Sequence, residues 1–302
     1  MAKTGSGLKR LLRILVVHSA TDLFKYKSFF LLIFALILLD RVIKKYVHID
    51  RSSMDLAQLG ELSAASADYL FNQVPGLLWV LLTDYRTFLI LSGLFFLKQI
   101  ISLWPSSDMR RMHRKERGMF GLLSSLVGIR WQQVVWDAIA VGTICGLYAI
   151  WATLGFIVTR TGWNAHPHGI WIVLFLLCMG LFLPLGMAGF SYSSKLAVLS
   201  RGNFREKLGL FYRLFTTGRV LWPSWIFFSC RIALESIFVL IIPIAVLLFV
   251  DSFWVRIMVA TLLATPVYSY LKMASFKFFL EIYQPYDLVQ QEYHTYYADN
   301  PE

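Results

Sequence analysis

The segment "WIFFSCRIALESIFVLIIPIAVLLFV" (225–250) decides the fold class of this chain. It is longer than the roughly 20 apolar residues with which a helix crosses the hydrocarbon core of a bilayer. Two charged residues, Arg231 and Glu235, interrupt the otherwise apolar run. In a helix they lie one turn apart on the same face, so each charge lowers the cost of burying the other. The segment therefore predicts a membrane-spanning helix that carries an ion pair.

The composition extends this interpretation to the whole chain. Hydrophobic residues make up 57% of the 302 residues and charged residues only 16%, whereas soluble domains average about 25% charged residues. We therefore expect an all-α fold, a polytopic helical membrane protein. The net charge of +11 is attributed to segments that face anionic lipid headgroups at the cytoplasmic surface, and no nucleic-acid partner is predicted.

Six apolar runs are long enough to cross a bilayer. They cover residues 28–47, 77–103, 134–158, 170–191, 225–250 and 254–279. Residues 1–27 place Leu and Val at helical spacing with basic residues elsewhere on the turn, which predicts an amphipathic helix on the membrane surface. The predicted organisation is an interfacial segment (1–27), a transmembrane domain of about six helices (28–279) and an acidic, Tyr-rich cytoplasmic tail beyond the last helix (280–302).

The distribution of Lys and Arg predicts the orientation. Segments 1–27, 98–133 and 192–224 hold six, seven and six of the 29 Lys and Arg residues, and the segments between them hold few. Cytoplasmic loops carry an excess of these residues, so both termini are expected in the cytoplasm, with the protein in an inner membrane. The basic stretch "PSSDMRRMHRKERG" (105–118) is predicted to be solvated chain.

Arg231 and Glu235 are the first candidate site. They form either a structural ion pair that bonds a neighbouring helix or the lining of a polar path. Asp84, Arg86 and Asp137 are further intramembrane polar candidates. Asp84 and Arg86 are ordinary interface residues if the second span begins there, and Asp137 near a helix N-terminus, where anions are favoured, needs no special role.

The run 134–158 carries a stripe of small residues four apart, Ala138, Gly142 and Gly146. Small residues at this spacing let another helix approach closely. We expect this face to pack against a helix of the same chain, with a homo-oligomer contact as the alternative. The three Cys residues are isolated from one another, and neither a disulfide framework nor a metal site is predicted.

No nucleotide-binding, zinc-protease or nucleophile-elbow motif occurs in the sequence. The leading prediction is a non-enzymatic integral membrane protein without a cofactor, acting as a partner subunit of a membrane complex or as a handler of lipid or other hydrophobic cargo. One alternative is a small secondary transporter with a polar path near Arg231 and Glu235. Another is an intramembrane enzyme that acts on lipid headgroups, with cytoplasmic basic residues binding phosphate.

Overall fold

The computed structural model describes residues 27–46, 85–113, 121–165, 170–249 and 252–298. These residues are helical apart from short connections, and no strand occurs among them, so the all-α prediction is confirmed. The helices are α3 (Lys27–Tyr46), α5 (Tyr85–His113), α6 (Gly121–Val127), α7 (Trp131–Ala165), α8 (Ile170–Leu199), α9 (Phe204–Thr216), α10 (Gly218–Phe249), α11 (Phe253–Tyr283) and α12 (Asp287–Ala298). The predicted amphipathic helix in 1–27 and the residue Asp84 lie outside the described residues.

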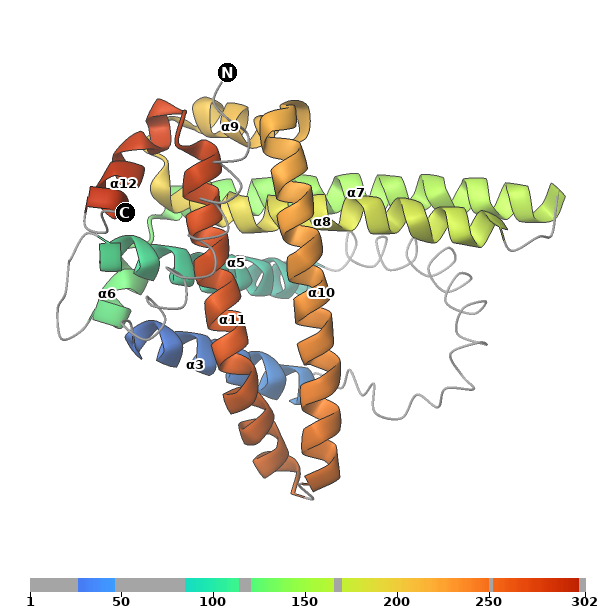
Figure 1. The fold of residues 1–302 in the computed structure, drawn as a ribbon, viewed down its shortest axis with the longest axis horizontal. Coiled ribbons are helices and arrows are strands. Elements are labelled where there is room, and N and C mark those ends of the chain that lie inside the picture. The colour runs from blue at the N-terminus through green and yellow to red at the C-terminus, as the bar shows by residue number, and fades with distance from the viewer. Residues whose placement is uncertain (1–26, 47–84, 114–120, 166–169, 250–251, 299–302) are drawn as a thin grey trace, which may run out of the picture.

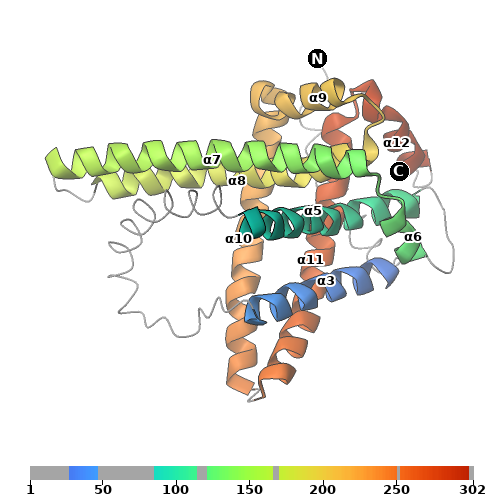
Figure 2. The ribbon, with the colours of Figure 1, turned by 180° about the vertical axis from the view of Figure 1, so that it is seen from behind.

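The long helices form two sets that run crosswise to each other (Figures 1 and 2). Helices α7 and α8 pair as a hairpin and share a direction with α5 and α3. The hairpin of α10 and α11 runs across this set, with α10 against α8 and α11 against α3. The short helices α9 and α12 pack at the end of the molecule where α10 begins and α11 ends.

This crossing differs from the six-span prediction, which assumes helices that all run up and down along one direction. The length of an apolar run indicates whether a helix can cross a bilayer, but it does not predict the angle at which two helices pack. The crossing angle depends on the side chains at the contact, which become neighbours only in the folded protein.

Aromatic side chains fill the core where the two sets cross. The buried Tyr192 of α8 lies with its ring centroid 5.6 Å from that of Phe228 in α10, and 5.4 Å and 5.6 Å from those of Phe279 and Tyr283 in α11. Its hydroxyl is 3.2 Å from Ser224 Oγ, so the polar end of the ring is also satisfied. Burial of these large rings holds α8, α10 and α11 together.

The part of the basic stretch 105–118 that the structure describes, residues 105–113, is helical and not the solvated chain that was predicted. Residues 105–113 complete α5, and Ser106, Ser107 and Asp108 are buried. Helix α6 provides hydrogen-bond partners for this polar segment. Ser107 Oγ donates to the Ser125 carbonyl at 2.8 Å, and Trp104 Nε1 donates to Ser125 Oγ at 2.9 Å. A tertiary partner therefore makes a polar segment part of the core.

The tail also contains more structure than its composition indicated. Residues 280–283 complete α11, and α12 buries Val289, Glu292 and Tyr293 against the rest of the protein. Glu292 Oε1 lies 3.0 Å from Arg110 Nη2 of α5, which ties α12 to the end of α5. One ion pair thus joins the end of α5 to α12, although the two are far apart in the sequence.

Candidate functional site

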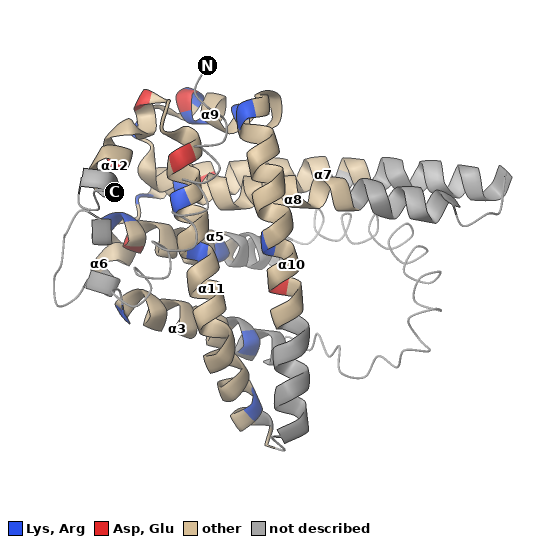
Figure 3. Ribbon diagram, in the orientation of Figure 1, with Lys and Arg blue, Asp and Glu red and all other residues tan. Residues whose placement is uncertain are grey.

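The contact predicted between Arg231 and Glu235 is present in α10. Arg231 Nε lies 2.8 Å and Nη2 lies 2.7 Å from Glu235 Oε1, and the two side chains are 8% and 17% exposed. Arg231 Nη1 also donates to Ser275 Oγ of α11 at 2.7 Å. The guanidinium therefore contacts its own helix and the neighbouring helix at once. In Figure 3 both a basic and an acidic position lie within α10.

Asp137 of α7 is fully buried. Ser102 Oγ of α5 donates to its Oδ2 at 3.0 Å, and the Ser193 hydroxyl of α8 also interacts with the carboxylate. The sequence placed this residue near an interface with no special role. In the structure it instead joins three helices through one carboxyl group.

Two lysines connect Asp137 with the Arg231–Glu235 pair. Lys195 of α8 is buried, donates to the Ser191 carbonyl at 2.8 Å, and interacts electrostatically with Asp137 and Arg231. Lys272 of α11 interacts with Arg231, Glu235 and Asp137. We call these five residues the central ionic cluster: Asp137, Lys195, Arg231, Glu235 and Lys272.

The sequence analysis missed Lys195 and Lys272 as site residues. Both follow serine or tyrosine residues at the ends of apolar runs, where a lysine is typical of a basic flank facing water or headgroups. Both lie in similar local sequences in the C-terminal halves of their helices, "FSYSSKLA" (190–197) and "YSYLKMA" (268–274). Only the crossing of α8 with α11 brings the two lysines into one cluster.

The small-residue stripe of α7 does not make the predicted helix contact within the described chain. Ala138 is buried, but Gly142 and Gly146 are exposed, and a Cβ added at either glycine would meet no described atom within 4 Å. The close approach is at Gly189 of α8, where a Cβ would lie 2.8 Å from Ile144 Cδ1 of α7. The side chain of Arg86, like Asp84, lies outside what the structure describes.

A second feature is a basic cavity of about 1030 Å³. It lies between the start of α7, the end of α8 and the start of α9, and Arg110 of α5 reaches it. Its four cationic side chains are Arg110, Arg130, Arg201 and Lys207. Burial lowers the pKa of Lys207, and the charges of Arg110 and Arg130 lower that pKa further, which shows how closely the positive charges gather here.

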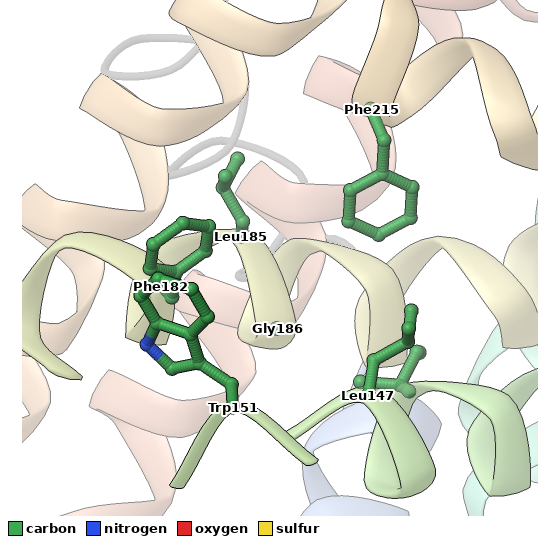
Figure 4. Close-up of a pocket in the computed structure, with 7 residues that line it drawn as sticks. Leu147, Trp151, Phe182, Leu185, Gly186 and Phe215 are labelled. Carbon is green, nitrogen blue, oxygen red and sulfur yellow. The ribbon is translucent and has the colours of Figure 1, made fainter. Parts of the chain in front are cut away.

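A third feature is an apolar pocket of about 210 Å³ between α7, α8 and the end of α9. Figure 4 shows Trp151 and Phe182 side by side at one end of the pocket and Phe215 at the other. The ring centroids of Trp151 and Phe182 are 4.4 Å apart. The lining is almost entirely hydrocarbon, so the pocket suits an apolar group.

The described residues contain no group of three His, Cys, Asp or Glu side chains that could hold a metal ion. By length and composition, one helix in the described part of the chain is able to cross a membrane, Trp254–Tyr283 of α11. No protein-family model, curated protein or solved structure matches the chain.

Proposed function

We propose that this chain is an integral membrane protein that handles a lipid or another hydrophobic molecule and performs no chemistry on it. The observation that carries the proposal is the distribution of polarity on the α10–α11 hairpin: large apolar side chains are exposed on its outward face, and polar side chains are buried in the protein interior among the apolar core residues. In water this arrangement is unfavourable, because soluble proteins rarely expose large continuous apolar surface.

The outward side chains of the hairpin are large and apolar. Exposed positions include Ile226, Leu234, Ile237, Val255, Met258, Leu262 and Leu263. The inward side chains of α11 include the fully buried Thr261, Thr265 and Ser275, whose hydroxyls donate to carbonyls one turn earlier at 2.7 Å. Lipid offers no hydrogen bonds, so polar groups in a membrane helix must find such internal partners.

The predicted cytoplasmic segments also meet at one end of the fold. Arg110, from segment 98–133, donates to the Val198 carbonyl in segment 192–224 at 2.6 Å and pairs with Glu292 of the tail. This supports an orientation in which these segments and the C-terminus share the cytoplasmic side. We propose α10 and α11 as two of the spans, and a full set of six would require the α7–α8 hairpin to share their direction in the bilayer.

The apolar pocket supports lipid or hydrophobic cargo, and we assign it to an acyl chain. Ile150 and Leu181, exposed apolar residues of the same helices, adjoin the lining residues Trp151 and Phe182 in the sequence, which supports an apolar approach to the pocket. A pocket of about 210 Å³ is below the usual range of about 300–1,000 Å³ for drug-sized ligands. It therefore fits part of a chain and not a whole ligand.

A photoactivatable phospholipid, reactive on its acyl chain, tests this function. The full-length protein is expressed in membranes, irradiated, and mapped by mass spectrometry. We expect the protein to stay in the membrane after alkaline extraction and to carry label on α7 and α8. Leu147→Trp, which fills the pocket from its exposed side, should reduce that label, whereas Leu263→Trp on α11 should not. Alkaline extraction into the soluble fraction would overturn the membrane assignment, and unchanged labelling of Leu147→Trp would overturn the cargo assignment.

The central ionic cluster favours a second function, a small secondary transporter. Buried charges in membrane helices commonly mark substrate or proton paths. Ser275 accepts from Arg231 at the centre of the cluster, so Ser275→Cys reports access to it. In a background without the three native cysteines, a transporter would let a membrane-impermeant thiol reagent reach this position. A structural ion pair would leave it protected.

A further inference from the structure

We infer that the basic cavity is a binding site for a phosphate-bearing anion, either the headgroup of an anionic phospholipid or a soluble phosphate compound. The headgroup version rests on the membrane location proposed above, and the soluble version does not.

The first argument is charge. Four cations from α5, the α6–α7 connection, the α8–α9 connection and α9 line one cavity, and no Asp or Glu is among its described lining residues. The charge of Arg110 is paired with Glu292, which does not line the cavity. Gathering the remaining positive charges costs electrostatic free energy, which an anion in the cavity would recover.

The second argument is the state of Lys207. Its Nζ donates to the Ala197 carbonyl at the end of α8, at 3.2 Å, so the amine is held at the cavity rather than free in solvent. The lowered pKa of this amine has the cause expected for a cation site without its anion, namely burial followed by two like charges. A bound phosphate would raise this pKa.

The third argument is the backbone and the neutral side chains. The first turn of α7, a helix of 35 residues, lines the cavity through Trp131, Gln132 and Gln133. A helix N-terminus carries partial positive charge that favours phosphate, and the glutamine amides add neutral donors. The first turn of α9 lines the cavity as well, but its Glu206 carboxylate, which accepts from the Asn203 N–H at 2.7 Å, places a negative charge there. The matching contact on α7 is neutral, because Gln133 Oε1 accepts from the Arg130 N–H at 2.8 Å, so α7 is the helix that favours an anion.

The rim of the cavity indicates why a lipid headgroup fits. Trp131 is 63% exposed and Phe204 is 48% exposed, and both line the cavity. Exposed aromatic rings beside basic residues are typical of the headgroup region of a membrane. The volume of about 1030 Å³ is also large enough for a headgroup with its glycerol.

The test uses the full-length protein in a neutral maltoside detergent with three soluble probes: dihexanoyl phosphatidic acid, dihexanoyl phosphatidylcholine and inorganic phosphate. The cavity variant is Arg130→Gln with Arg201→Gln, both exposed positions. The matched control is Arg205→Gln with Arg219→Gln, which removes the same charge from exposed positions that do not line the cavity. Binding is measured by calorimetry, and unfolding midpoints without probe establish that both variants fold.

We expect phosphatidic acid to bind the parent and the control variant with about equal affinity. The cavity variant should bind it with an affinity lower by about tenfold or more, since each basic residue near an anionic group contributes substantially to the binding free energy. Added salt should weaken binding to the parent. Phosphatidic acid binding at least tenfold more tightly than inorganic phosphate identifies a lipid headgroup, and equal affinity identifies a soluble phosphate ligand. No binding of any anion, or equal losses in the cavity and control variants, would overturn the inference. Neither outcome bears on alkaline extraction, so failure of this site is distinguishable from failure of the membrane assignment.

Discussion

At the scale of single residues, the protein is organised by charges that are buried with their partners. Arg231 contacts Glu235 and Ser275, and Asp137 contacts Ser102 from another helix. Each of these groups would be costly alone in an apolar surrounding and is tolerated because a second polar group lies within hydrogen-bond distance. The consequence is that removing one partner should cost more than removing both.

Glu235→Gln should destabilise the protein more than the double variant Arg231→Met with Glu235→Leu. The single change leaves the Arg231 charge with neutral partners only, whereas the double change removes both charges. Breaking a fully buried pair costs about 3–5 kcal/mol, and the partial exposure of Glu235 lowers our expectation to about 1–3 kcal/mol. Thermal unfolding in detergent measures both variants. Equal stability of Glu235→Gln and the parent would show that the two side chains are not coupled.

Asp108 should make stability depend on pH. Burial raises its pKa to about 6, with the Ser125 hydrogen bond and Arg111 acting in the opposite direction. Between pH 3.8, the ordinary pKa, and about pH 6, the folded protein keeps a proton on Asp108 that the unfolded chain has released. The free energy of unfolding therefore falls as pH rises through this window and levels off above it. The total fall is about 2–3 kcal/mol at roughly 1.4 kcal/mol per pKa unit.

Unfolding midpoints from pH 4 to pH 7.5 check this expectation. Asp108→Asn should reduce the fall between pH 4 and pH 6 by this amount, and Asp287→Asn, at an exposed position on α12, should keep the fall in full. A fall of the same size in both variants would assign the pH dependence to other groups.

At the scale of elements, α9 packs against both helices of the α7–α8 hairpin. Phe211 of α9 lies with its ring centroid 6.0 Å from that of Trp136 in α7, and a Cβ on Gly189 of α8 would lie 3.8 Å from Phe211. The same Cβ would lie 2.8 Å from Ile144 Cδ1 of α7. The close approach of α7 and α8 therefore requires a small residue at Gly189 and not at the Gly142–Gly146 stripe that the sequence indicated.

Gly189→Leu should destabilise the protein, and Gly142→Leu should not. A side chain at position 189 meets Ile144 and Phe211, and overpacking of this kind typically costs about 1–3 kcal/mol. A side chain at position 142 meets open space in the described chain. Thermal unfolding and gel filtration of both variants provide the comparison. A large loss of stability or of oligomer size in Gly142→Leu would instead show that this face meets a second copy of the chain.

At the scale of the whole molecule, the crossing of the two hairpins is the feature that most constrains the proposed arrangement in a membrane. Transmembrane helices tilt by up to about 40° from the bilayer normal. The two hairpins run crosswise in Figure 1, so a membrane normal that follows one hairpin runs across the other. A single membrane normal can therefore follow α10 and α11 or α7 and α8, but not both in this conformation.

Single cysteines in the sequence between the paired helices test this constraint. Asp251→Cys falls between α10 and α11 in the sequence, and His168→Cys falls between α7 and α8, each in a background without native cysteines. We expect an impermeant thiol reagent added outside intact cells to label Asp251→Cys and not His168→Cys. Labelling of His168→Cys alone would make α7–α8 the spanning hairpin. Labelling of both would contradict the crossing and restore the six-span arrangement.

The sequence by itself determined the helical class, the positions of the long apolar helices and the Arg231–Glu235 contact, because all three depend on residues within a few turns of one another. It did not determine the burial of Asp108, the joining of Asp137 to Lys195 and Lys272, or the basic cavity. Those features depend on which helices cross and at what angle. The crossing angle is decided by the packing of side chains that are far apart in the sequence, such as Tyr192 against Phe228 and Phe279. The local hydrophobic pattern does not predict that packing.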